Sequence, residues 1–169
     1  MDNTERFEKA YMGAPFRLAV VPLVPILNTP MAGAQPCRTL QALQASHNGG
    51  KHGVGIAMGA ASQVWALMIN KQLADGQASL REIEKANAPL PPTWLAENKS
   101  GTQYLFFAWT DLLPIENRTS IAPGIDVRGE GSFVAVPPTD GYKWIRSPSQ
   151  TDLYAPDEWL VKLVTPDRR

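Results

Sequence analysis

Cysteine and histidine are scarce in this chain. Among its 169 residues there are two histidines and one cysteine, Cys37. A lone cysteine cannot form an internal disulfide, and so few sulfur and imidazole groups cannot supply a zinc site of the usual ligand spacing. The sequence therefore predicts a protein of a reducing compartment, the cytoplasm, without a structural zinc ion.

An excess of either charge is also absent. Lysine and arginine total 16, aspartate and glutamate total 16, and the formal net charge at pH 7 is +0. A protein that binds nucleic acid through its overall charge is strongly basic, so this balance argues against that class. A local basic groove on a neutral protein remains compatible with the composition.

Long hydrophobic runs are missing as well. The longest apolar stretch, residues 16–27, contains Arg17 and is interrupted by Pro22 and Pro25. About 20 apolar residues are needed to span a bilayer, so this stretch cannot do so. The opening MDNTERFEK is polar, unlike a secretory signal. We expect a soluble intracellular protein with no membrane partner.

Helical and strand patterns alternate along the chain, which predicts an α+β fold in one domain, residues 1–169, with a mixed or antiparallel sheet flanked by helices. Capping residues and apolar spacing predict helices over residues 3–13, 37–47, 75–86 and 155–164. Apolar or alternating runs predict strands over residues 16–25, 53–59, 62–70, 102–109 and 141–145, and two more strands within residues 122–138.

Two strand pairs are expected to be neighbours. The runs at 53–59 and 62–70 are apolar throughout, which indicates burial on both faces, and only a short glycine-containing link separates them. The segment APGIDVRGEGSFVAVPP, residues 122–138, predicts a hairpin with Glu130 at a solvated corner between two strands. Asp126 and Arg128 are two residues apart in the first of these strands, so they share one face.

Five segments, in this order, resemble the N-terminal domain of bifunctional DNA primase-polymerases, the prim-pol branch of the archaeo-eukaryotic primase superfamily. They are PLVPILNTP, HGVGIAMGAASQVWALMIN, KSGTQYLFF, PGIDVRGEGSFVAVPP and LYAPDEWLVKLV. The fourth is the closest match. The resemblance covers nearly the whole chain, and it implies an archaeo-eukaryotic-primase-like fold and a role in the DNA replication of a phage or plasmid.

The resemblance also implies a set of catalytic positions, most of which carry other residues here. The family ends its buried strand with two acids separated by one residue, where this chain has Met68 and Asn70. The family places a nucleotide-binding histidine where this chain has Tyr104. The third family acid is retained as Asp126. Ser100 and Gly101 are also retained, and they imply a nucleotide-binding element.

These departures remove most of the charge that polymerase chemistry needs. Two divalent ions about 3.5–4 Å apart clamp the reacting oxygens in such enzymes. At an effective dielectric constant near 20 they repel each other by ~15 kcal/mol, which clustered carboxylates must offset. A thioether is a poor ligand for Mg²⁺, and an amide oxygen adds no charge. The sequence predicts no catalytic activity and no cofactor; Mg²⁺ or Mn²⁺, held by Asp126, is expected only in an active enzyme.

Three other acids are candidates to replace the missing ligands. Asp75 precedes the predicted helix at 75–86 and is better explained as its N-cap. Glu130 lies at the predicted hairpin corner, and Asp140 lies in the turn sequence TDG. None of the three is expected to complete a metal site.

Arg128 and Lys51 are the candidate phosphate ligands. A guanidinium binds phosphate by a two-pronged contact, so Arg128 beside Asp126 is consistent with an anion site. A plain ion pair on the strand face is the alternative, and it remains open. Lys51 lies in the sequence GGKHG, next to His52, where a surface loop without a ligand is the alternative.

Three functions remain open from the sequence. The favoured one is a degenerate, catalytically inactive primase-polymerase-like protein that keeps a binding role toward single-stranded DNA or nucleotide. The second is a protein-interaction module, for example a phage-encoded inhibitor or adaptor that acts on a host or phage protein. The third is an active primase or polymerase with unusual metal ligands, such as Asp75 with Asp126.

Overall fold

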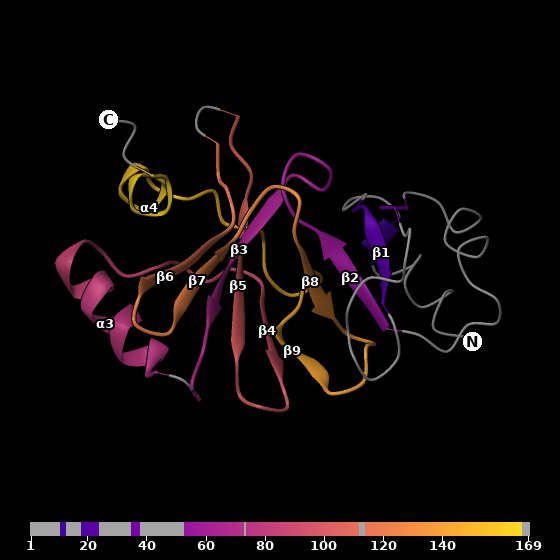
Figure 1. Ribbon diagram of the computed structural model, residues 1–169, viewed down its shortest axis with the longest axis horizontal. Helices are drawn as coiled ribbons and strands as arrows, with labels where there is room; N and C mark the ends of the chain where they lie inside the picture. The colour runs from indigo at the N-terminus through magenta and orange to yellow at the C-terminus, as the bar shows by residue number, and fades with distance from the viewer. Residues whose placement is uncertain are drawn as a thin grey trace.

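The computed structural model describes residues 11–12, 18–23, 35–37, 53–72, 74–111 and 114–166. Its described part contains two antiparallel sheets and two helices, an α+β arrangement (Figure 1). Within these ranges, no helix combines the length and the apolar character that crossing a bilayer demands. Most of the predicted helix at 3–13 and most of the one at 37–47 lie outside the described residues. Cys37 forms an isolated β-bridge with Val20.

The larger sheet has six strands. In spatial order they are β6 (Arg118–Ala122), β7 (Ile125–Arg128), β3 (Val64–Ile69), β5 (Gln103–Ala108), β4 (Leu95–Asn98) and β9 (Tyr142–Arg146). All neighbouring pairs are antiparallel. β3 is central and buried on both faces, as its continuous apolar sequence predicts.

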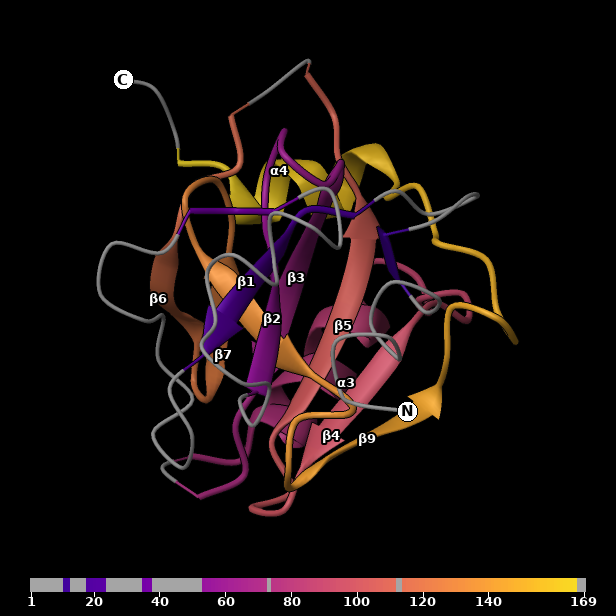
Figure 2. The same cartoon turned by 90° about the vertical axis from the view of Figure 1, so that its right-hand side faces the viewer.

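The smaller sheet has three antiparallel strands. Their order is β1 (Val20–Leu23), β2 (Gly53–Ala57) and β8 (Phe133–Val136). This sheet packs against one face of the larger sheet. Figure 2 looks onto the smaller sheet, with the larger sheet behind it and the helices behind both.

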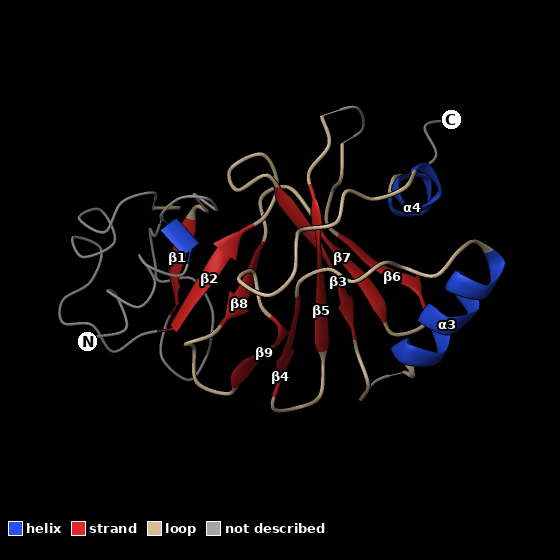
Figure 3. Cartoon of the chain, turned by 180° about the vertical axis from the view of Figure 1, so that it is seen from behind, coloured by secondary structure: helices blue, strands red, loops and turns tan. Residues whose placement is uncertain are grey.

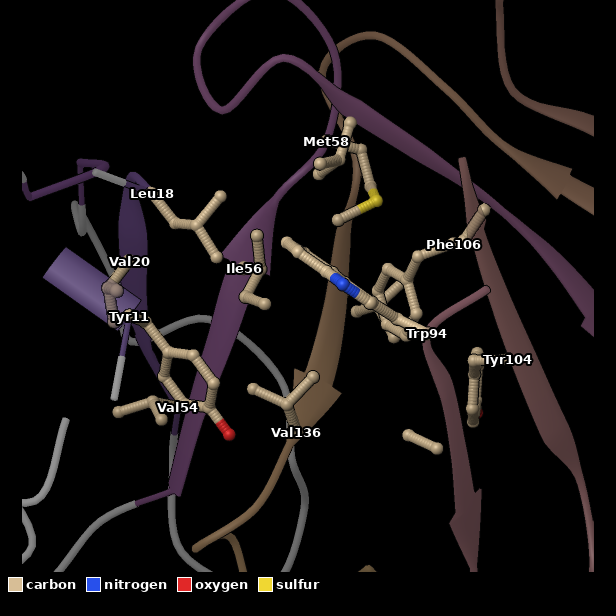
Figure 4. Packing of buried hydrophobic residues seen from close by; sticks show 14 of the residues in the cluster. Tyr11, Leu18, Val20, Val54, Ile56, Met58, Trp94, Tyr104, Phe106 and Val136 are labelled. Atoms are coloured by element: carbon tan, nitrogen blue, oxygen red, sulfur yellow. The ribbon is translucent and has the colours of Figure 1, made fainter. Parts of the chain in front are cut away.

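The core between the sheets is apolar and aromatic. Figure 4 shows Ile56 and Val136 from the smaller sheet facing Phe106 from β5 and Trp94, which precedes β4. Tyr11 joins this core, where its hydroxyl accepts a hydrogen bond from the Trp144 indole (2.7 Å) and donates to the Pro137 carbonyl (2.5 Å). Burial raises the pKa of Tyr11, so the hydroxyl stays protonated and can donate.

The helices cover the opposite face of the larger sheet. They are α3 (Gly76–Ala86) and α4 (Glu158–Val164), and Figure 3 shows both on the side away from the smaller sheet. α3 packs Leu80 and Ile83 on this face, and α4 buries Leu160 and Val164 there. Asp75 caps α3 by accepting the Ala78 N–H (2.9 Å), which confirms the predicted N-cap.

Two of the strand pairings predicted from the sequence are wrong. β2 and β3 belong to different sheets, and Gly59, which follows β2, forms an isolated bridge with Val64 at the start of β3. Likewise β7 and β8 do not form a hairpin, because β7 pairs with β3 and β6 whereas β8 pairs with β2. The chain crosses between the sheets at residues 129–132. The hairpin is instead β6–β7, and β4 and β6 are strands that the sequence analysis missed.

Candidate functional site

A row of side chains crosses three strands of the larger sheet. Met68 on β3 lies opposite Asp126 on β7 and opposite Tyr104 on β5. Residues directly opposite each other in antiparallel strands share a face, and here it is the face toward the smaller sheet, since Tyr104 and Met68 belong to that core. Three of the four positions that the resemblance singled out therefore lie side by side.

Asp126 is held by two protein groups. Its Oδ1 accepts the main-chain N–H of Ser120 (2.8 Å), and its Oδ2 lies 3.9 Å from the Nη2 of Arg128. The side chains of Asp126 and Arg128 are 25% and 33% exposed, so water still reaches the ion pair. Both carboxylate oxygens thus have a partner within the chain.

Arg128 links the acid to the residue beside it. Its Nη2 donates to the Sδ of Met68 at 3.2 Å while it also approaches Asp126. A thioether is a weak acceptor, so this contact orients the guanidinium at little energetic cost. The positive charge consequently lies over the row, beside the one acid that it contains.

Asn70 is used in a turn. Its Oδ1 accepts the N–H of Gln72 (2.7 Å), and its main-chain carbonyl accepts the N–H of Gly76 (2.9 Å). Its own N–H donates to the Gly124 carbonyl (2.7 Å). The side-chain oxygen of Asn70 therefore holds the connection from β3 to α3.

A cleft of about 480 Å³ opens beside this row. Met68, Tyr104 and Arg128 line it from the larger sheet, and residues 131–135 line it from β8 and the turn before it. Burial raises the pKa of the Tyr104 hydroxyl, and the neighbouring Tyr142 raises it further, against the opposing effect of Arg128. Tyr104 is therefore a neutral hydroxyl at physiological pH, where a histidine would exchange protons.

Ser100 and Gly101 lie elsewhere, in the turn between β4 and β5. The Oδ1 of Asn98 accepts the N–H groups of Ser100 (3.0 Å) and Thr102 (3.1 Å), and Gly101 has a φ of +80° that favours glycine. Gly101 lines a second cleft of about 410 Å³, together with Lys99 and Lys143. The turn and Arg128 therefore border different clefts, and Tyr142 lines both.

The remaining candidates are spread out. Lys51 lies outside the described residues. Glu130 is exposed as expected, but its Oε2 also accepts the Ala60 N–H (2.8 Å), which ties the β2–β3 link to the crossing between the sheets. Asp140 is fully exposed in its turn and lies 3.7 Å from Lys99.

Tyr142 and the β8 strand are cleft residues that the sequence analysis missed. Tyr142 lies in the predicted strand GYKWI, and no motif marks it as different from the other aromatic residues of the core. β8 was expected to be half of a hairpin, a position that hides its role as a wall of the cleft. Only the pairing of the strands reveals both.

Two packed antiparallel sheets, with helices behind the larger one and a cleft at their junction, define a primase-polymerase-like fold. Residues 9–159 match the sequence model of the family described as bifunctional DNA primase/polymerase, N-terminal (Prim-Pol). The chain belongs to this family, as its motifs predicted, and membership connects it with DNA metabolism. No curated protein matches the chain.

The residues around Asp126 do not fit the divalent ions that polymerase chemistry in this family implies. Met68 contributes sulfur, the Asn70 oxygen accepts a turn hydrogen bond, and Asp126 has a partner on each oxygen. In the part of the chain that the structure describes, no three His, Cys, Asp or Glu side chains come close enough together to hold a metal ion.

Proposed function

We propose that this domain binds single-stranded nucleic acid or nucleotide in its cleft without catalysing nucleotide transfer, as part of the replication of a phage or plasmid. The observation that carries the proposal is the Met68 side chain directly opposite Asp126, with the Arg128 guanidinium in contact with both. The Met68 thioether and the Arg128 guanidinium thus both lie beside Asp126, the single acid of the row.

The electrostatics favour an anion over a cation at this position. A divalent ion about 5 Å from the Arg128 charge is repelled by ~7 kcal/mol at an effective dielectric constant near 20. The single charge of the Asp126 carboxylate, 3.9 Å from Arg128, at most cancels this repulsion, so the pair offers a divalent ion no net attraction. A phosphate reverses the sign of the interaction with Arg128 and gains a charge-assisted hydrogen bond.

Binding is tested with the protein and a fluorescent single-stranded DNA 20-mer, by anisotropy at low salt in EDTA. We expect metal-independent binding that weakens about tenfold in Arg128→Gln, with a salt slope lower by roughly 0.7 because one phosphate contact is lost. Arg81→Gln is the matched control, since Arg81 is exposed on α3, on the far side of the larger sheet. That variant should bind like the unaltered protein.

Catalysis is tested by primer synthesis with radiolabelled nucleotides and Mn²⁺, for which we expect no product. A product that Asp126→Ala abolishes would show an active enzyme and refute the proposal. If neither the 20-mer nor a nucleotide binds at low salt, the nucleic-acid role is wrong. The protein-interaction role, which the zero net charge favours, would then be tested by pull-down from host lysate.

A further inference from the structure

β8 is an edge strand whose free side faces the cleft. Hydrogen-bonded and non-hydrogen-bonded pairs alternate along an antiparallel ladder. Met58 donates its N–H to the Ser132 carbonyl (2.8 Å), so Val134, two residues on, also points its polar groups toward β2. The main-chain groups of Phe133 and Ala135 therefore point away from β2.

The neighbouring strand supports this assignment. Ala57, which lies opposite Phe133, donates its N–H to the Ala19 carbonyl (2.9 Å). That bond runs to the β1 side of β2. The polar groups of Ala57 are consequently not available to Phe133, and the same alternation applies to the next pair, Gly55 with Ala135.

The outward groups of β8 belong to one buried residue, Ala135, and one partly exposed residue, Phe133. Ala135 is 6% exposed, and it lines the cleft with Phe133 and Arg128. Among the described residues, no hydrogen bond to the outward N–H or C=O of Phe133 or Ala135 is formed. Enclosed main-chain groups without a partner are rare in folded proteins, so a bound molecule is the natural source of one.

An extended residue presents its N–H and C=O side by side in one plane, which is how antiparallel residues exchange two hydrogen bonds. A nucleobase has the complementary arrangement, since its hydrogen-bonding edge carries a donor beside an acceptor. A peptide strand fits less well: Pro137 and Pro138 end β8 immediately after Val136, and only two residues point outward.

The other walls of the cleft also suit one nucleotide. Tyr104 and Tyr142, with ring centroids 6.3 Å apart, and Met68 provide aromatic and apolar contacts for a flat ring. Arg128 lies at the same cleft for a phosphate. The volume of about 480 Å³ is in the range that small-ligand sites use.

We propose that the outward main-chain edge of β8, at Phe133 and Ala135, recognises the hydrogen-bonding edge of one nucleobase while Arg128 contacts the phosphate of the same strand. This inference rests on the proposed binding function. It adds that the base is recognised as well as the backbone, through main-chain groups that substitution of side chains leaves in place.

The test uses the unaltered protein with three single-stranded hexamers: one of deoxyadenosine, one of N6,N6-dimethyldeoxyadenosine and one without bases. All three carry the same phosphates, and only the first keeps the donor of the base edge. We expect the deoxyadenosine hexamer to bind about tenfold tighter than either of the others, by calorimetry in EDTA.

Other outcomes overturn the inference in distinguishable ways. Equal affinity for all three hexamers means that only phosphates are recognised, which refutes the base contact and leaves the binding function intact. Equal affinity for the two hexamers with bases, above that for the abasic one, means stacking alone and also refutes it. If no hexamer binds, the binding function fails together with the inference.

Ala135→Pro provides a second test. Proline removes the outward N–H, and it breaks no hydrogen bond between β8 and β2 because the N–H of Ala135 points away from β2. The same sheet already carries Pro22 at an outward position of β1. We expect this variant to bind the deoxyadenosine hexamer several-fold more weakly, because the acceptor of the base edge loses its N–H partner, and to keep its affinity for the abasic hexamer. Undiminished affinity for the deoxyadenosine hexamer would contradict the proposal; if the variant does not fold, the hexamer series on the unaltered protein decides.

Discussion

Replacing Asp126 by alanine should destabilise the protein even though no ligand is present. The Asp126 Oδ1 holds the N–H of Ser120, a non-glycine residue with a φ of +52°, at a point where the pairing of β6 with β7 shifts register. The replacement removes this hydrogen bond and the 3.9 Å ion pair with Arg128.

The magnitude follows from the two contacts. A hydrogen bond to a charged group contributes ~1.5–3 kcal/mol, and water at the exposed Ser120 recovers part of it. An ion pair as exposed as this one contributes about 0–1 kcal/mol. We expect Asp126→Ala to lower the free energy of unfolding by about 1–2 kcal/mol, which corresponds to a melting temperature lower by roughly 2–8 °C for a chain of this size.

Urea denaturation followed by far-UV circular dichroism measures this loss. Asp126→Asn is the matched control, because the amide oxygen still accepts the Ser120 N–H while the charge is gone. It should cost less than half as much as the alanine replacement. If the alanine variant is as stable as the unaltered protein, Asp126 does not support β6, and its carboxylate is instead free to serve a ligand.

Two further predictions concern stability away from the cleft. Arg118 donates from Nη1 to the carbonyls of Leu163 (3.4 Å) and Val164 (3.1 Å) at the end of α4, so Arg118→Ala should cost about 1–2 kcal/mol in a urea titration. The hydrogen bond from Gln103, and to a lesser extent Lys143, lowers the pKa of Glu97 below 4.5. Its contribution to stability is therefore present above pH 4.5 and lost as pH falls through the lower, folded-state pKa, so Glu97→Gln should reduce the loss of stability between pH 5 and pH 3.

The sequence predicted the local elements better than their partners. Asp75 before an apolar 3.6-residue pattern predicted α3 and its cap, because both signals act within one turn of helix. The predictions of which strands pair with each other were wrong for a different reason. β2 and β3 are buried on both faces, so the apolar pattern marks them as strands without indicating which sheet each one joins.

In the candidate site, too, local relationships could be predicted from the sequence and relationships between strands could not. Asp126 and Arg128 share a face because they are two residues apart, and their side chains lie 3.9 Å apart in an ion pair that the sequence left open. That Met68 lies opposite Asp126 depends on strand register, for which only the family resemblance offered a signal. No sequence signal marks the edge of β8 that lacks a partner among the described residues, because this edge arises where the two sheets meet.

Manganese binding tests the central claim most directly. The claim is that a thioether, a turn-bound amide and a single paired carboxylate leave too little negative charge to seat two divalent ions. Titration of the protein with Mn²⁺ in the presence of a nucleoside triphosphate, followed by electron paramagnetic resonance, should show no spin-coupled ion pair and no binding that Asp126→Ala removes. Two coupled ions that Asp126→Ala abolishes would contradict the account.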